Sequence, residues 1–277
     1  MWIGRLVGKL FHLFSRKRRK IAAINVAACF PEKSESEQKH IVMRHFDSLG
    51  MSIIESAMSW WMPGSTLMAL AEIEGKENLD QALNKDQGII LLSAHFNSLE
   101  ISAPLLISNT QCSVQAVYQA NSNDLLEKII TEGRKNNVSA LISHKDIRHM
   151  IRALKRNEIV WYAPDQGYAG KFSEIVPFFS IPAASNTAAS RLSKISGASV
   201  LPFFIRQKPD YSGYVLTILP ALDNFPTDDS IADTERYHHI IEAAIRKSPE
   251  QYLWIHRRFK NRPKEYPDLY KNIVLRK

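Results

Sequence analysis

The chain has 277 residues, of which 45% are hydrophobic and 23% charged, a composition that excludes a disordered protein and allows one large core or two modest ones. Its formal net charge of +8 indicates an anionic partner, which is a nucleic acid, a membrane surface or an acidic substrate. The two cysteines lie far apart without CxxC spacing, which excludes a cysteine-based zinc site and a disulfide framework and fits a reducing compartment.

The first twenty residues combine apolar side chains with a basic cluster. Residues 1–14 are rich in large apolar side chains, and residues 16–20 are five consecutive basic ones. As a helix, residues 1–14 would extend about 21 Å, short of the roughly 30 Å hydrocarbon core of a bilayer. We therefore expect residues 1–20 to lie on an anionic membrane surface. The alternatives are a helix docked on the protein's own core and the end of a longer hydrophobic anchor.

A long helix is predicted next. Ser34 and Glu37 have the S-x-x-E spacing of a capping box, and the helical pattern that follows should end before Pro63. The apolar positions of this helix are too many for one stripe. We expect them to pack mainly in the core, with Trp60 and Trp61 at lipid headgroups as the alternative.

From residue 73 onward, strand-like and helix-like segments alternate. Strands are predicted at 88–94, 113–118, 138–143, 159–163, 199–205 and 213–219, and helices at 76–84, 98–108, 123–136, 145–157, 183–196 and 230–247. This alternation predicts an α/β fold with a mainly parallel central sheet flanked by helices, preceded by an N-terminal helical membrane-associating arm. We expect one α/β domain at 21–277, with a helical arm at 21–72 and a catalytic core at 73–277.

The predicted strand at 88–94 delivers a titratable side chain to an edge of the sheet. Residues 89–92 are four consecutive apolar residues, typical of a strand buried on both faces, and His95 follows where the run stops. Ligands of open α/β sheets bind at the carboxyl ends of strands. His95 is therefore a candidate general base, and Glu100, in the first turn of the next helix, is the candidate carboxylate that orients its imidazole. The alternative is a structural histidine beside an ordinary first-turn carboxylate.

A second loop is expected beside that of His95. Asp165 follows the predicted strand at 159–163, where a carboxylate can bind hydroxyl groups or steady a neighbouring base, although it can also be a simple turn former. Lys171 follows in the same loop. Arg191 lies in the helix predicted at 183–196 and is either solvated or in contact with phosphate.

Common signatures of other enzyme classes do not occur in the sequence. There is no GxGxxG, P-loop, GxSxG or HExxH motif, which removes the routine nucleotide-binding and hydrolase interpretations. His238 and His239 are adjacent and cannot share one side of a helix, so no metal site is expected there. The interleaved aromatic and basic motifs of nucleic-acid binders are also missing, and no nucleic-acid partner is expected.

Four blocks in order resemble the late acyltransferases of lipopolysaccharide assembly. The blocks are AHFNSLE (94–100), WYAPDQGYAGK (161–171), VPFFSIPAASNTAASRLSKISGASVLPFF (176–204) and SPEQYLWIHRRFKNRP (248–263). Together they look like those of the bacterial lipid A biosynthesis lauroyl/myristoyl acyltransferases, which belong to the HxxxxE acyltransferase superfamily, and the resemblance covers nearly the whole chain. The HxxxxE motif of that family, which is its catalytic motif, falls on His95 and Glu100.

The resemblance implies the transfer of a fatty acyl group from acyl carrier protein to a hydroxyl of a hydroxyacyl chain. The acceptor would be a lipid A precursor of the Kdo2-lipid IVA type, at the cytoplasmic face of the bacterial inner membrane, with acyl carrier protein as co-substrate and no cofactor. Both substrates are anionic, which fits the net charge. Substrate-binding roles are expected for Asn97, Arg134, Asp165, Lys171 and Arg191, among which Arg134 matches a basic family position.

Three departures from the family pattern concern the acceptor. Gln119 stands where the family usually carries Arg, Ser143 and His144 stand near a second such position, and Gly167 replaces a more usual acid. The reaction type is therefore more firmly implied than the acceptor. Two alternatives stay open, namely acyl transfer to another glycolipid or a lysophospholipid, and glycolipid binding without catalysis.

Overall fold

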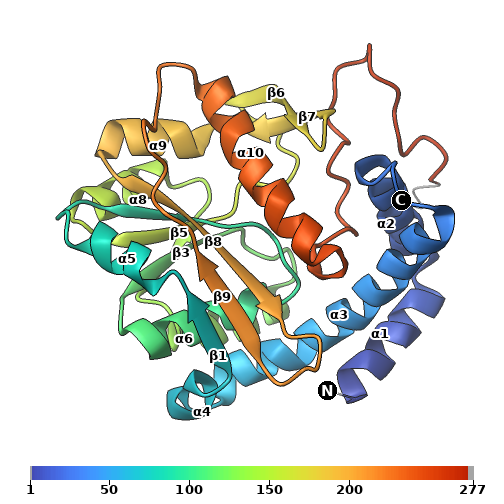
Figure 1. Ribbon diagram of the computed structural model, residues 1–277, viewed down its shortest axis with the longest axis horizontal. Helices are drawn as coiled ribbons and strands as arrows, with labels where there is room; N and C mark the ends of the chain where they lie inside the picture. The colour runs from blue at the N-terminus through green and yellow to red at the C-terminus, as the bar shows by residue number, and fades with distance from the viewer. Residues whose placement is uncertain (1, 274–277) are drawn as a thin grey trace.

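A seven-stranded sheet forms the centre of the molecule in the computed structural model, which describes residues 2–273 (Figure 1). Met1, in the expected membrane segment, and residues 274–277, at the end of the expected core, lie outside the described residues. The strand order is β1 (Ala71–Glu74), β9 (Tyr214–Ile218), β8 (Ser199–Gln207), β2 (Ile89–Leu92), β5 (Ile159–Tyr162), β3 (Val114–Tyr118) and β4 (Ala140–Ser143). Neighbouring strands are parallel except β8 and β9, so the predicted α/β class with a mainly parallel sheet is confirmed.

Helices cover both faces of this sheet. They are α1 (Trp2–Phe14), α2 (Arg16–Cys29), α3 (Glu35–Trp61), α4 (Gly64–Met68), α5 (Lys76–Leu83), α6 (Leu99–Thr110), α7 (Asp124–Lys135), α8 (Ile147–Lys155), α9 (Ala188–Ser196) and α10 (Ser230–Lys247). Helices α8, α9 and α10 pack on one side, and α3, α4 and α6 pack together on the other (Figure 1). Among the residues that the structure describes, none of the helices combines the length and the apolar character needed to span a bilayer.

The predicted strands and all but one of the predicted helices are confirmed to within a few residues. The helix predicted at 183–196 is wrong in its first half, because β7 (Ile181–Asn186) pairs there with β6 (Ser173–Phe178) in a separate antiparallel hairpin. The prediction rested on the many small residues of this segment, which would allow a helix to pack closely. They are instead buried strand residues, and the buried guanidinium of Arg258 donates to the carbonyl of Ala184 and to Ser185 Oγ. Strands β1 and β6 and helix α4 were not predicted.

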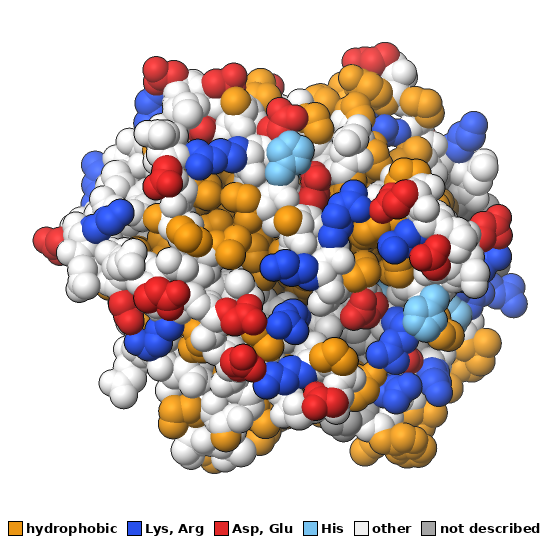
Figure 2. Space-filling model, in the orientation of Figure 1, with side chains coloured by type: hydrophobic (Ala, Val, Ile, Leu, Met, Phe, Trp, Pro, Cys, Tyr) orange, Lys and Arg blue, Asp and Glu red, His pale blue; other side chains and the backbone are white. Residues whose placement is uncertain are grey.

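Helix α1 lies against α3 through its glycines. A Cβ atom at Gly8 would overlap the carbonyl oxygen of Phe46, and one at Gly50 would overlap the backbone of Gly4 and Gly8, so only glycine permits this approach. The ring of Phe11 also packs edge-on against that of Phe46, with centroids 5.6 Å apart. The other large apolar side chains of α1 are exposed, namely those of Trp2, Ile3, Leu6, Leu10, Leu13 and Phe14. Apolar side chains accordingly lie at the surface over α1, at the lower right of Figure 2. The helix therefore docks mainly by its small residues and leaves most of its apolar surface uncovered.

Helix α2, which together with α1 is called the N-terminal arm from here on, contacts the C-terminal segment of the chain. It begins with the basic residues 16–20, so the boundary expected at residue 20 falls inside a helix. Arg18 donates a hydrogen bond to the carbonyl of Ile255 at 3.1 Å. The buried amide of Asn25 donates to the carbonyls of Trp254 and His256, each at 2.7 Å. Helix α2 thus holds the backbone at 254–256 in place.

Helix α3 bridges the arm and the sheet. The predicted capping box is confirmed, because Ser34 accepts from the backbone of Glu37 and the Glu37 carboxylate accepts from the backbone of Ser34. The helix ends before Pro63, as predicted. Trp60 packs against Gly133 of α7, whereas Trp61 next to it is 72% exposed.

Candidate active site

His95 and Asp165 meet because their strands are neighbours in register. Strand β2 pairs in parallel with β5, and Leu92, the last residue of β2, is opposite Tyr162, the last residue of β5. His95 and Asp165 each follow three residues later, so parallel pairing carries both to the same edge of the sheet. The predicted placement of His95 after a fully buried strand, and of the Asp165 loop beside it, is confirmed.

The buried side of the imidazole is held by Asp165. Oδ1 of Asp165 lies 2.6 Å from His95 Nδ1, and Oδ2 accepts from the backbone N–H of His95 at 3.1 Å. Burial opposes the charged imidazole, but the charge and hydrogen bond of Asp165 outweigh it and raise the pKa of His95 above its ordinary value. Burial likewise works against the ionised carboxylate, but the charge and hydrogen bonds of His95 prevail and lower the pKa of Asp165 to about 2. The pair therefore favours a carboxylate that stays ionised beside the base.

Tyr252 completes this arrangement from the C-terminal segment. Its hydroxyl donates to Oδ2 of Asp165 at 2.8 Å, and burial raises its pKa well above the ordinary value. The backbone next to it clasps the His95 loop, since Leu253 N–H donates to the carbonyl of His95 and Asn97 N–H to that of Gln251. Tyr252 was not among the predicted site residues. The only signal for it was its position inside the fourth block of the resemblance.

Glu100 does not hold the imidazole of His95, contrary to expectation. Its carboxylate accepts from Nε and Nη2 of Arg134 at 2.9 and 2.7 Å, and from the indole N–H of Trp60 at 2.9 Å. The predicted place of Glu100 in the first turn of α6 is confirmed. That turn, however, directs the side chain toward α3 and α7, which carry Trp60 and Arg134. Burial opposes the charged guanidinium, but the hydrogen bonds and the charge of Glu100 outweigh it and raise the pKa of Arg134.

The other predicted substrate-binding residues have different surroundings. Asp165 is fully buried and lines neither cavity described below, and its contacts with His95 and Tyr252 fit the second of its expected roles, which is to steady the base. The amide of Asn97 is also buried and donates to Ser48 Oγ at 3.0 Å, which is a structural contact. Arg134 and Lys171 each line a cavity next to His95. The exposed guanidinium of Arg191 stacks on the ring of Phe172, 4.3 Å from its centroid.

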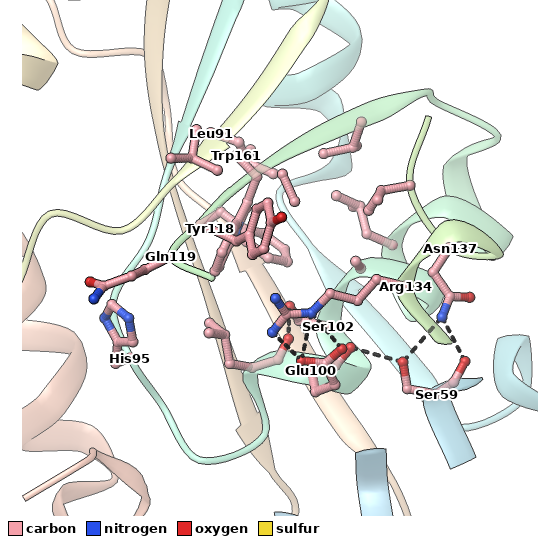
Figure 3. A pocket seen from close by; sticks show the side chains of 18 residues that line it. Ser59, Leu91, His95, Glu100, Ser102, Tyr118, Gln119, Arg134, Asn137 and Trp161 are labelled. Carbon is pink, nitrogen blue, oxygen red and sulfur yellow. Dashed lines mark hydrogen bonds and ion pairs between the residues drawn. The ribbon is translucent and has the colours of Figure 1, made fainter. Parts of the chain in front are cut away.

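An apolar cavity of about 240 Å³ opens on one side of His95 (Figure 3). Its wall consists mainly of aliphatic and aromatic side chains, namely those of Leu91, Leu99, Ala103, Leu106, Val114, Ala116, Val117, Val138, Trp161 and Phe203. Figure 3 shows His95 and Gln119 on one side of the cavity, Asn137 and Ser59 on the opposite side, and Glu100 with the head group of Arg134 between them. This apolar cavity suits an alkyl chain whose reactive end lies at His95.

A polar groove of about 540 Å³ adjoins His95 on another side. It shares five lining residues with the apolar cavity, which are His95, Val117, Tyr118, Gln119 and Trp161. Most of the rest of its wall comes from the loops after β4 and β5, including Lys145, Gln166 and Lys171, and it is completed by Ile147, Tyr162, Asn186 and Ala188. His95 therefore stands where an apolar and a polar compartment meet.

The exposed ring nitrogen of His95 makes this site suited to proton transfer. Nε2 of His95 has no hydrogen-bond partner among residues 2–273, and 29% of the side chain is exposed. No cluster of three or more potential metal ligands occurs within the described part of the chain. A base with its Nδ1 fixed, an open Nε2 and an adjoining apolar cavity suits the activation of a hydroxyl group for attack on an acyl carbonyl.

Comparison with known proteins gives the same class of reaction. The sequence profile of the bacterial lipid A biosynthesis acyltransferases matches residues 2–261. The chain is 37% identical to the lipid A biosynthesis lauroyltransferase of Escherichia coli K12 over 273 residues, covering 97% of this chain and 87% of that protein. It is also 37% identical to the palmitoleoyltransferase of the same organism over 271 residues, with the same coverage.

A Haemophilus influenzae lipid A biosynthesis acyltransferase is 36% identical over 97% of this chain and 86% of its own length. Among solved structures, the 1-acyl-sn-glycerophosphate acyltransferase of Thermotoga maritima gives a TM-score of 0.42 at 14% identity, covering 84% of this chain and 97% of that one. By the profile match and the identity to these relatives, the chain belongs to the bacterial lipid A biosynthesis acyltransferase family, a family of O-acyltransferases.

Proposed function

We propose that the protein transfers a fatty acyl group from acyl carrier protein to a hydroxyl on a hydroxyacyl chain of a lipid A precursor of the Kdo2-lipid IVA type. The observation that carries this proposal is the position of His95, which is fixed by Asp165 and faces an apolar cavity. Family membership supports the acyl transfer, and the names of the relatives support lipid A chemistry.

In the proposed mechanism, His95 Nε2 takes the proton of the acceptor hydroxyl as its oxygen attacks the thioester carbonyl. A C–O bond forms, the C–S bond breaks, and the proton passes from the imidazolium to the departing thiolate, so no acyl-enzyme is needed. Asp165 accepts the Nδ1 hydrogen bond and stabilises the imidazolium formed in between. Because the pKa of His95 is raised, it is a stronger base than a free imidazole.

The apolar cavity would hold the acyl chain of the donor. Its volume and the length of its apolar wall would limit the chain, because an additional methylene that does not fit is rejected by about 1–3 kcal/mol. In the wall of the cavity, Glu100 fixes Arg134, which we propose as a positively charged substrate contact. In this proposal Glu100 acts as a positioning residue for Arg134 and not as the partner of the base.

The surface of the arm would bring the enzyme to its acceptor. Helix α1 exposes its large apolar side chains, and the basic residues 16–20 follow directly. We propose that this surface binds the cytoplasmic face of the bacterial inner membrane, where apolar burial and attraction to anionic lipids add together. Acyl carrier protein, as a second anionic substrate, would be favoured by the net charge of +8.

The test is an in vitro assay of the full chain with acyl carrier proteins of graded chain length and a tetra-acylated lipid A precursor, read by mass spectrometry. We expect one added acyl group per acceptor with the wild-type protein. His95→Ala should lower kcat by about 10³- to 10⁴-fold while the circular dichroism spectrum stays unchanged. His239→Ala, at a histidine that is 61% exposed, is the control.

Near wild-type turnover by His95→Ala would contradict the assigned role of the imidazole. Turnover with a lysophospholipid or another glycolipid but not with the lipid A precursor would select the alternative acceptor class. Tight binding of the precursor without acyl transfer by the wild-type protein would identify a glycolipid-binding relative.

A further inference from the structure

The polar groove beside His95 contains two lysines and no acid. Its lining includes Lys145, Lys171, His95 and His144, and none of its eighteen lining residues is Asp or Glu. Two carboxylates adjoin lining residues along the chain, and neither lines the groove: Asp165 is buried behind the imidazole, and Asp146 caps α8 by accepting from the backbone N–H of His149. An acid-free wall with two lysines favours an anionic ligand.

The cations at the rim have no carboxylate partners. Lys145, Lys171 and Arg191 are exposed, and none of them forms a salt bridge within residues 2–273. Two of them contact one aromatic ring instead, since the Arg191 guanidinium lies 4.3 Å and the Lys171 ammonium 5.8 Å from the centroid of Phe172. Phe172 itself lines the groove. The ring therefore gathers positive charge at the rim without neutralising it.

Part of the remaining wall supplies side-chain amides. Gln119 stands at the junction with the apolar cavity, and Gln166 lines the groove only. The amide of Asn186 also lines the groove but already donates to the Tyr162 hydroxyl. The indole Nε1 of Trp161, which also lines both compartments, is buried without a hydrogen-bond partner from the described residues. Amides and an unpaired indole N–H complement a ligand that itself carries amide or carbonyl groups.

The order of these environments matches one linear molecule. A ligand lying through both compartments would pass from the apolar wall to His95 and Gln119, which line both, and then into the groove that contains Gln166, Lys145 and Lys171. An acyl phosphopantetheine thioester has the same order, with an alkyl chain, a thioester carbonyl, two amides and a phosphate. We propose that the polar groove binds the phosphopantetheine arm of the donor, with Lys145 and Lys171 at its phosphate. This assignment rests on the proposed function, in which the donor is a thioester of acyl carrier protein.

The experiment compares two small donors that differ by one phosphate, S-acyl-phosphopantetheine and S-acyl-pantetheine, with the tetra-acylated lipid A precursor as acceptor. For the wild-type full chain we expect a lower KM with the phosphorylated donor. The double variant Lys145→Met/Lys171→Met should raise that KM about 10- to 100-fold, the effect of losing charge-assisted contacts. The KM for acyl-pantetheine and for the acceptor should not change.

A matched control removes the same charge at the other edge of the sheet. Lys85 and Lys155 are exposed and precede β2 and β5, so Lys85→Met/Lys155→Met alters the net charge equally without touching the groove. This control should retain the wild-type preference for the phosphorylated donor. An equal effect of both double variants would mean general electrostatics and would overturn the assignment.

Two further outcomes would also overturn it. The wild-type protein could use both donors equally well, or the groove variant could raise the KM of the acceptor and leave that of the donor unchanged, which would assign the lysines to a phosphate of the acceptor. Both outcomes still include acyl transfer to the lipid A precursor, so they leave the proposed function standing. Failure of the wild-type protein to transfer from any thioester would instead contradict the proposed function.

Discussion

The two carboxylates on either side of His95 have opposite surroundings. Asp165 is fully buried and is hydrogen-bonded to the imidazole and to the Tyr252 hydroxyl, and among residues 2–273 it forms no salt bridge other than that with His95. Glu100 borders the apolar cavity and is paired with a guanidinium and an indole N–H. Asp165 is fixed by its place after β5 and by the C-terminal segment. Glu100 is fixed by side chains from α3 and α7.

This difference teaches that distance along the chain is a poor guide to which carboxylate serves the base. Glu100 is five residues from His95 but points into the layer of helices, whereas Asp165 is seventy residues away and reaches Nδ1. The parallel register of β2 and β5 accounts for the second contact. The HxxxxE spacing thus places Glu100 at the apolar cavity, whereas strand pairing in the sheet brings Asp165 to the imidazole.

The sharpest test of the comparison is Asp165→Asn. Asparagine removes the charge that raises the pKa of His95 but leaves the burial that lowers it. A general base must be neutral, so activity rises with pH through the pKa of His95, and this inflection should move to lower pH in the variant. The rate at its optimum should fall about 10³-fold, because the imidazolium loses its counter-charge. A pH profile of kcat/KM measures both effects. An inflection that moves in Glu100→Gln but not in Asp165→Asn would reverse the two roles.

A third carboxylate, that of Glu55, shows what burial does in the absence of a cation. It is 1% exposed, accepts from Gln207 and Tyr214, and burial raises its pKa to about 7. The folded protein therefore holds a proton that the unfolded chain releases, and stability falls as the pH rises from about 4.5 to about 7.

Glu55→Gln should abolish this loss of stability. The variant should be more stable than the wild type by on the order of 3 kcal/mol above pH 7 and should differ little at acid pH. Urea unfolding at several pH values measures the difference. A stability difference that does not vary with pH would show that Glu55 is ionised in the folded protein.

Glu100→Gln tests the cavity side of the comparison. The amide keeps an acceptor for Trp60 but loses the charge that fixes Arg134. We expect kcat/KM to fall about 10- to 100-fold, the contribution of a charge-assisted pair. The pH inflection should shift less than in Asp165→Asn. Arg134→Gln should reproduce the loss, and the double variant should lose little more than either single one. Fully additive effects would indicate that the two side chains act independently.

The smallest effect is expected from Trp60→Phe, which removes the indole hydrogen bond to Glu100 and keeps an aromatic ring beside Gly133. We predict a three- to tenfold decrease in kcat/KM, about that of one hydrogen bond to a charged group. Trp61→Phe is the matched control, because Trp61 is 72% exposed and forms no hydrogen bond through its indole within residues 2–273. Equal losses in both variants would mean that the effect does not pass through Glu100.

Part of this site follows from local sequence, and part depends on contacts between distant segments. The apolar run at 89–92 suffices to predict a buried strand that ends near His95, and the same argument places the loop of Asp165 at that edge. Which carboxylate reaches the imidazole depends on strand order and register, which no short segment encodes. Tyr252 is fixed by a backbone clasp from the far end of the chain, so no local pattern points to it.

The error at 183–196 has a related origin. A run of alanines and serines predicts a helix by its small size, but Ala184 and Ser185 are small because Arg258 packs against the strand. The partner that explains these residues lies more than seventy positions away. Prediction from local composition therefore fails where a distant side chain sets the space available.

Arg18 and Asn25 donate hydrogen bonds to the backbone at 254–256, and this has a practical consequence for the preparation of the enzyme. A shortened version lacking α1 and α2, made to remove the exposed apolar surface and ease purification, would also lose the side chains that fix the segment beginning at Tyr252. The low activity of this shortened version would then be wrongly attributed to the loss of membrane binding. Replacing the exposed side chains of α1 one by one, with α2 intact, avoids that confusion.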